Sequence, residues 1–224
     1  TLNEEQSNAY KDILTFLRSN DKIFLLSGSA GTGKTTLITE IIKNPSINKK
    51  KIALCATTNK AVSVIQNMYN LDSKNVHFST IHKLLQIKRM IQSDGSESYV
   101  VNLDESPKNK KRSIFFYDIL IIDEASMISK DLVHEIITLT KKIKGKIVFI
   151  GDCFQLPPIN ENTSLVFKSN FQNFQLTKVE RSKNNIVKYS NALRDNMEFK
   201  KKIKYKEILD NDVNIIKEFP KWLN

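Results

Sequence analysis

Apolar residues along the chain follow two periods, one typical of helices and one typical of buried strands. Residues 3–19 place Ala9, Ile13, Phe16 and Leu17 on one face, which predicts an amphipathic helix. Unbroken apolar runs predict buried strands at 22–28, 51–57, 118–123, 146–152 and 174–179. Helical spacing predicts further helices at 37–43, 59–69, 79–87, 129–142 and 183–195.

Strands that alternate with helices predict an α/β fold, in which a parallel sheet is flanked by helices. Residues 88–117 interrupt this alternation. They contain Asp94-Gly95, a strong hairpin signal, followed by the basic run SPKNKKRS. We therefore expect one domain formed by 1–87 and 118–195, a β-hairpin and basic-loop insertion at 88–117, and a C-terminal extension over 196–224.

The composition argues against a membrane-spanning protein but does not decide whether the chain binds nucleic acid. Apolar residues make up 40% and charged residues 26%, and no apolar run is long enough to span a bilayer, so no membrane contact is expected. The net charge of +11 favours polyanionic partners, but lysines supply most of it, and lysine-rich composition also accompanies AT-rich genomes. Cys55 and Cys153 have neither zinc-site nor disulfide spacing, so we expect two buried, reduced thiols and a cytoplasmic protein.

A glycine-rich segment, GSAGTGKT at 28–35, matches the pattern GxxxxGK[ST] between a predicted strand and a predicted helix. Glycines let backbone N–H groups turn around an anion, Lys34 can reach the β- and γ-phosphates, and the Thr35 hydroxyl can bind Mg²⁺. A glycine turn that matches by chance is the alternative. The predicted nucleotide contacts are Gly28, Ser29, Ala30, Gly31, Thr32, Gly33, Lys34, Thr35 and Thr36.

Two carboxylates, Asp123 and Glu124, end the apolar run at 118–123. The carboxyl ends of parallel strands are where such sheets bind ligands. Asp123 is predicted to hold Mg²⁺ together with Thr35, and Glu124 to polarise the attacking water as a general base. The alternative is a polar strand end that caps the next helix.

With these motifs in place, the chain resembles superfamily 1B helicases, the 5′→3′ DNA motors that include the RecD family and Dda. The resemblance implies a RecA-like P-loop NTPase fold that uses ATP and Mg²⁺. It rests on segments that match the helicase motifs in order: 2–10, 28–36, 56–62, 79–85, 121–128, 151–159 and 176–182.

The resemblance also implies roles for single residues. Gln6 would contact adenine, Gln155 would sense the γ-phosphate, and Arg181 would act as an arginine finger, although Gln155 and Arg181 could be ordinary surface residues. Six residues would contact single-stranded DNA through its backbone: Thr57, Thr58, Asn59, Lys60, Thr80 and His82. The group at 57–60 could equally be a helix N-cap, and His82 a surface histidine.

The hairpin in 88–117 would be either a strand-separating pin at a duplex junction or a structural insertion. The resemblance further implies a second RecA-like domain, so we expect a piece of a longer, monomeric helicase that hydrolyses ATP poorly alone. Two rival functions remain open. One is a DNA-independent P-loop enzyme such as a kinase, and the other is an ATP-switched nucleic-acid-binding module.

Overall fold

A six-stranded parallel sheet forms the centre of the computed structural model, which describes residues 2–69, 71, 74–91, 97–101 and 114–180. Its strands lie in the order β3-β2-β6-β7-β1-β8. They are β1 (Ile23–Gly28), β2 (Ile52–Ala56), β3 (Val76–Thr80), β6 (Ile119–Ile122), β7 (Lys146–Gly151) and β8 (Gln172–Leu176). The central strands are buried along almost their whole length, as expected of a sheet covered on both faces.

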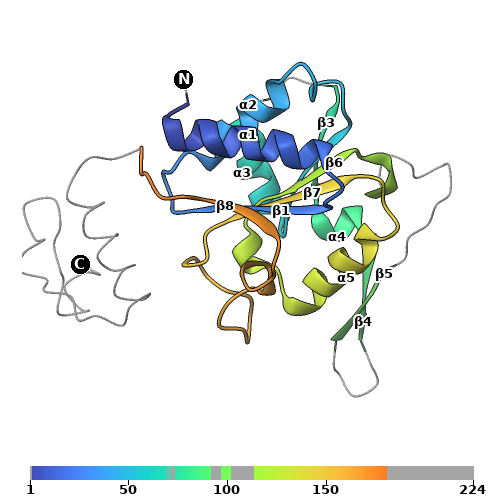
Figure 1. The fold of residues 1–224 in the computed structure, drawn as a ribbon. Coiled ribbons are helices and arrows are strands. Elements are labelled where there is room, and N and C mark those ends of the chain that lie inside the picture. Colours follow the sequence, from blue (N-terminus) through green and yellow to red (C-terminus); the bar gives the residue numbers. More distant parts are fainter. Residues whose placement is uncertain (1, 70, 72–73, 92–96, 102–113, 181–224) are drawn as a thin grey trace, which may run out of the picture. The chain divides into compact units, whose positions relative to one another are not determined.

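Helices cover both faces of the sheet (Figure 1). One face carries α1 (Glu4–Arg18), α2 (Lys34–Lys43) and α3 (Asn59–Tyr69), and the other carries α4 (Ile81–Leu84) and α5 (Lys130–Thr140). Each face has its own hydrophobic core. Three short 3₁₀ turns complete the described elements: η2 (Ile114–Phe116), η3 (Ala125–Met127) and η4 (Leu165–Phe167). The predicted α/β fold, a parallel sheet flanked by helices, is confirmed.

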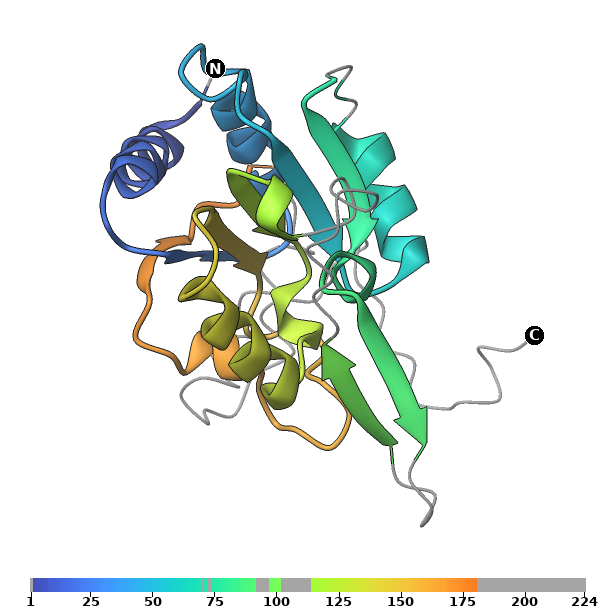
Figure 2. The same ribbon diagram turned by 90° about the vertical axis from the view of Figure 1, so that its right-hand side faces the viewer.

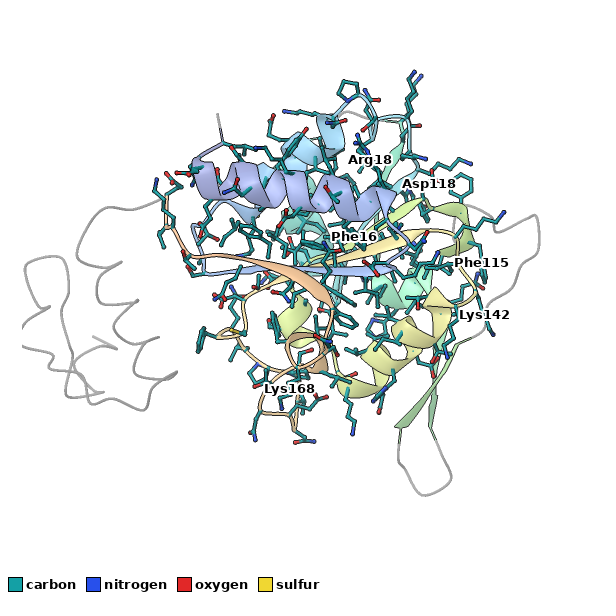
Figure 3. All side chains as sticks on the ribbon, viewed as in Figure 1. Phe16, Arg18, Phe115, Asp118, Lys142 and Lys168 are labelled. Carbon is teal, nitrogen blue, oxygen red and sulfur yellow. The ribbon has the colours of Figure 1, made fainter. Side chains whose placement is uncertain are left out.

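Helix α1 is fixed at both ends. At its start, Asn3 and Gln6 form a reciprocal capping box, in which each side chain accepts a hydrogen bond from the other's backbone N–H. At its end, Lys146 Nζ donates to the carbonyl oxygens of Phe16 and Ser19 and lies 5.1 Å from the centre of the Phe16 ring. Figure 3 shows Phe16 between α1 and the sheet. The first residue of β7 thus closes the last turn of α1.

The two edge strands differ from the prediction. A helix was expected over 79–87, but β3 extends to Thr80 and α4 covers only Ile81–Leu84. The last strand is Gln172–Leu176 rather than 174–179. Both strands lie at sheet edges, and each buries only one side chain, Ser79 or Leu176. An edge strand therefore lacks the apolar run by which the inner strands are recognised.

The predicted hairpin is present. Strands β4 (Ile87–Ile91) and β5 (Glu97–Val101) pair antiparallel, with Arg89 opposite Tyr99. In Figures 1 and 2 they lie apart from the central sheet, beside α5. Asp94-Gly95 and the basic run at 106–113 lie outside the described residues, so the pin hypothesis stays a prediction.

One of the two cysteines differs from the expectation. Cys55 is fully buried in β2, and burial raises the pKa of its thiol to about 12, but Cys153 is exposed because it follows β7 in a loop. Tyr117 lies in the core, whereas Phe115 is 37% exposed and points outward in Figure 3. Among the described residues, no helix has the length and apolar character needed to cross a membrane.

The chain divides into two compact units, Thr1–Thr177 and Lys178–Asn224. All the elements above belong to the first unit. In the second, the described residues are Lys178–Glu180, where the Lys178 ammonium lies 3.4 Å from a Glu180 carboxylate oxygen. Arg181, the helix expected at 183–195 and the extension at 196–224 lie outside the described residues.

Candidate nucleotide-binding site

The loops that follow the strands meet at one edge of the sheet, because all six strands are parallel. Strand register fixes which loops are neighbours. Ser27 lies opposite Gly151, and Cys55 lies opposite Ile122. The glycine-rich loop therefore adjoins the segment after β7, and the acidic pair adjoins the segment after β2.

The glycine-rich loop has the conformation of a phosphate-binding loop. Gly31 and Gly33 have φ angles of 82° and 84°, in the left-handed region that favours glycine. Gly33 is the N-cap of α2 and leaves the first-turn N–H groups without a side-chain cap, as anion binding at a helix start requires. Thr32 is buried, and its hydroxyl donates to the Ser29 carbonyl oxygen at 2.8 Å. The loop is therefore held in shape from inside.

Lys34 is oriented into this loop. Its Nζ donates to the carbonyl oxygens of Gly28 and Ser29, at 2.7 and 3.0 Å. Its positive charge also acts on Asp123, lowering the pKa of that carboxyl against the larger effect of burial. The loop thus holds an ammonium group at the point where phosphate charge would be neutralised.

Gln6 supports the loop from behind. The residue is 5% exposed, and its Nε2 donates to the Thr32 carbonyl oxygen at 3.0 Å. A Cβ atom on Gly33 would lie 2.3 Å from Gln6 Nε2. The sequence pattern Asn3-x-x-Gln6 indicates the helix cap, but it does not reveal the contact with Thr32, which is 26 residues away.

The acidic pair follows β6 directly. Asp123 N–H donates to the Cys55 carbonyl oxygen, and one Asp123 carboxylate oxygen accepts from Glu124 N–H, both at 2.8 Å. Burial, and secondarily the charge of Glu124, raise the pKa of Asp123 from 3.8 to about 6. Glu124 has a φ of 56°, a left-handed conformation that a non-glycine residue adopts at a cost of about 1–2 kcal/mol. Such strain is typical of functional positions.

Hydroxyl and carboxylate oxygens are the ligands that Mg²⁺ prefers, so Thr35 and Asp123 fit the predicted metal site. No group of three or more His, Cys, Asp or Glu side chains occurs among the described residues. Mg²⁺ at nucleotide sites commonly takes one or two protein ligands and completes its shell with phosphate oxygens and water.

The segment after β7 carries Gln155, which is exposed. Asp152, 3% exposed, accepts hydrogen bonds from Phe154 N–H at its side chain and from Gln155 N–H at its carbonyl, each at 3.1 Å. Asp152 therefore shapes the turn that presents Gln155. Sequence reasoning assigned it no role, although its place directly after a buried strand is the same signal that marked Asp123.

The residues predicted to contact DNA lie on neighbouring strand ends. Ala56 lies opposite Thr80, which brings the segment 57–60 beside Thr80 and His82. Thr58 and Thr80 also cap helices: their hydroxyl oxygens accept from Ala61 N–H at 3.1 Å and Lys83 N–H at 3.2 Å. The alternative reading as a helix cap is thus correct for Thr58, Thr80 caps α4 as well, and neither cap excludes a DNA contact.

His82 is half-buried at this edge. Burial lowers the pKa of its imidazole, and an interaction with the Thr57 backbone partly offsets the effect. His82 is therefore neutral at pH 7, and any contact with phosphate would be a hydrogen bond rather than an ion pair.

Residues 1–208 match the model of the AAA_30 family, described as an AAA domain. The chain belongs to this family. Two relatives agree with the predicted resemblance to superfamily 1B helicases. The RecD subunit of the RecBCD enzyme from Buchnera aphidicola (Schizaphis graminum) is 37% identical over 172 residues, which are 69% of this chain and 26% of that protein. The ATP-dependent DNA helicase Pif1 from Campylobacter jejuni is 30% identical over 194 residues, covering 77% of this chain and 40% of that protein.

Two crystal structures of Pif1 from Bacteroides share the fold at 21% sequence identity. One contains ADP-AlF4, with a TM-score of 0.63, and the other contains ADP-AlF3 and single-stranded DNA, with a TM-score of 0.60. Each match covers 90% of this chain and 47% of the Pif1 chain. The chain thus spans less than half the length of each of these relatives. The resemblance to superfamily 1B helicases and the RecA-like fold are confirmed, and the family implies nucleotide binding.

Proposed function

We propose that this chain is the nucleotide-binding motor domain of an ATP-dependent DNA helicase. One observation carries the proposal: a phosphate loop with Lys34 directed into it and an acidic pair share a sheet edge with exposed hydroxyl, amide and amine groups at 58–60, which follow the partly buried Thr57. The first two groups bind and hydrolyse a nucleoside triphosphate, and the third contacts the sugar–phosphate backbone. An acceptor-specific kinase would not need these exposed groups, which disfavours the first rival.

In the proposed chemistry, Lys34 and the first-turn amides of α2 bind the β- and γ-phosphates. Thr35 and Asp123 hold Mg²⁺, which when bound neutralises charge on the phosphate oxygens. Glu124 accepts the proton of the attacking water, and Gln155 senses the γ-phosphate. Arg181 stabilises the charge that develops on the transferring phosphoryl group. Gln6 contributes by holding Thr32, and we retain the proposal that its amide contacts adenine.

The proposed partner is single-stranded DNA, bound by Thr57, Thr58, Asn59, Lys60, Thr80 and His82 without base readout. Support comes from the exposure of residues 58–60 and from the register that places Thr80 beside them. Movement in the 5′→3′ direction, a duplex junction opened by the β4–β5 hairpin, a monomeric state and a cytoplasmic location are further parts of the proposal. They rest on the resemblance and on the sequence.

A titration of labelled oligo-dT tests this function. Binding is measured with and without a non-hydrolysable ATP analogue and Mg²⁺, over a series of salt concentrations. We expect affinity that changes with nucleotide, tolerates base sequence and falls steeply with salt. Lys34→Ala should remove the effect of nucleotide while the protein remains folded.

Glu124→Gln separates binding from hydrolysis in the same assay. It should preserve nucleotide-dependent DNA binding and remove ATP turnover, because the amide cannot accept the proton. Absence of oligo-dT binding at low salt would contradict the motor proposal and favour a DNA-independent enzyme. DNA affinity that is the same with and without nucleotide would also contradict the motor proposal.

A further inference from the structure

A buried tyrosine hydroxyl lies close to the acidic pair. Tyr69, the last residue of α3, is 3% exposed, and its ring packs in the hydrophobic core beneath α1, α2 and α3. Its Oη is shielded from solvent and makes no hydrogen bond of ordinary geometry with the described residues. A buried hydroxyl without a partner costs about 1–3 kcal/mol, so its retention calls for a reason.

Two side chains of the nucleotide site lie near this hydroxyl. Burial, and after it the negative charge of Asp123, raise the pKa of Tyr69 well above its ordinary value, while a hydrogen-bonding interaction with the Thr35 side chain, outside ordinary geometry, lowers it. These are the two residues whose oxygens fit the Mg²⁺ site. Because its pKa is raised, the phenol is neutral at pH 7 and can donate one hydrogen bond.

We propose that Tyr69 is a positioning residue of the nucleotide site, whose hydroxyl donates a hydrogen bond to the Asp123–Thr35 pair when that pair holds Mg²⁺. Metal ligands are commonly oriented by a hydrogen bond from a neighbouring group. The hydroxyl, which makes no hydrogen bond of ordinary geometry in the nucleotide-free protein, would gain one when the pair holds the metal. The inference rests on the proposed Mg²⁺–nucleotide site.

Tyr69 lies on the same helix as two of the residues proposed to contact DNA. Helix α3 begins at Asn59 and Lys60, which we propose to contact DNA, and ends at Tyr69. One rigid element therefore joins the proposed DNA-contacting residues to the side chains proposed to hold Mg²⁺. In the sequence, Tyr69 is only the last residue of the helix predicted at 59–69, and nothing there links it to Asp123.

Tyr69→Phe removes only the oxygen atom and keeps the ring. The test measures the affinity for a fluorescent ADP analogue in Mg²⁺ and in EDTA, together with the melting temperature of the nucleotide-free protein. We expect the gain in affinity on adding Mg²⁺ to fall by about 10-fold, and the affinity in EDTA to remain unchanged. The melting temperature should equal or exceed that of the wild type, because an unpaired buried hydroxyl is removed.

Tyr10→Phe is the matched control. The Tyr10 hydroxyl accepts a hydrogen bond from Asn44 Nδ2 at 2.6 Å, away from the nucleotide site. Loss of this hydrogen bond should lower the melting temperature without changing the gain in nucleotide affinity on adding Mg²⁺. In an Asp123→Asn background, Tyr69→Phe should have no further effect on nucleotide affinity, because the two residues act together.

Three results overturn the inference. In the first, Tyr69→Phe leaves the Mg²⁺-dependent gain in nucleotide affinity unchanged. In the second, Tyr69→Phe lowers nucleotide affinity equally in Mg²⁺ and in EDTA. In the third, Tyr69→Phe still lowers nucleotide affinity in the Asp123→Asn background. A wild-type protein that gains no affinity from Mg²⁺ would instead contradict the proposed nucleotide site itself, so the two failures are distinguishable.

Discussion

Gln6 Nε2 donates a hydrogen bond to the Thr32 carbonyl oxygen at 3.0 Å and so joins the start of α1 to the phosphate loop. The same side chain accepts from Asn3 N–H through its Oε1 atom. One buried amide therefore caps a helix and supports the loop that surrounds the phosphates. The shape of the loop depends on a residue that lies 26 positions earlier in the chain.

Gln6→Ala should weaken the binding of both ATP and GTP. The substitution leaves the Thr32 carbonyl without its donor and costs about 1–3 kcal/mol, part of which appears as lost affinity. Calorimetry with ADP and GDP in Mg²⁺ measures the effect. A contact between the amide and adenine would add a loss specific to ADP. If GDP affinity were unchanged, the loop-supporting role would be wrong.

Gly33→Ala should destabilise the protein by more than its φ angle alone explains. A left-handed alanine costs about 1 kcal/mol, and the added Cβ would also lie 2.3 Å from Gln6 Nε2. We expect a loss of about 2–3 kcal/mol in the free energy of unfolding, measured by urea denaturation.

The matched test of Gly33 is the same substitution in a Gln6→Ala background. Removing the Gln6 side chain relieves the overlap, so Gly33→Ala should then cost only about 1 kcal/mol. Equal costs in the two backgrounds would show that the Gln6 contact does not restrict Gly33.

Asp123 should make stability depend on pH in the nucleotide-free protein. Its pKa is raised from 3.8 to about 6, so the folded state binds this proton more tightly than the unfolded state does. The contribution of Asp123 to stability is therefore greatest below pH 3.8 and decreases as the pH rises towards 6. The total decrease is about 2–3 kcal/mol, since each pKa unit corresponds to about 1.4 kcal/mol.

Asp123→Asn tests whether the charged Asp123 side chain lowers the stability of the protein at neutral pH. At pH 7.5 the nucleotide-free variant should be more stable to urea than the wild type, and the difference should shrink as the pH is lowered to 4. The variant should also lose the gain in nucleotide affinity on adding Mg²⁺. A variant that is less stable at pH 7.5 would contradict the assigned cause, which is burial of an uncompensated charge.

Local sequence patterns predicted the inner strands and the long helices because their buried positions are occupied by apolar residues at regular spacing. The run at 118–123 and the helix at 59–69 are found where expected. Strand β3 was missed because only Ser79 is buried in it, and Cys153 was misplaced because β7 ends at Gly151, two residues before it. Edge strands and strand ends depend on tertiary neighbours that no local window contains.

The candidate site also has features that the sequence reveals and features that only the fold reveals. The phosphate loop and the acidic pair are contiguous in the sequence, so their chemistry is visible there. The Gln6–Thr32 hydrogen bond and the electrostatic interaction of Tyr69 with Asp123 join residues far apart in the chain, and each partner alone has an ordinary explanation. For Gln6 that explanation is a helix cap, and for Tyr69 it is a core aromatic. Only the fold brings these pairs together.

Lys60→Ala should weaken the binding of oligo-dT and reduce its dependence on salt. Lys60 is exposed in the first turn of α3, beside the proposed DNA contacts Thr58 and Thr80. Losing one phosphate contact should lower the slope of log K against log salt by about 0.7 for a single strand. The loss should be similar for all base sequences, because a phosphate contact carries no base readout.

Lys142→Ala is the control for charge alone. Lys142 is also exposed, but it follows α5 and precedes β7, at the opposite edge of the sheet from the phosphate loop, and Figure 3 labels it. Both variants lower the net charge by one, so a general electrostatic attraction would weaken DNA binding equally in each. A loss confined to Lys60→Ala locates the DNA at the carboxyl edge of the sheet. Equal losses would mean that the net charge of +11 draws DNA to the whole surface, and the proposed track across 57–60 and 80–82 would be wrong.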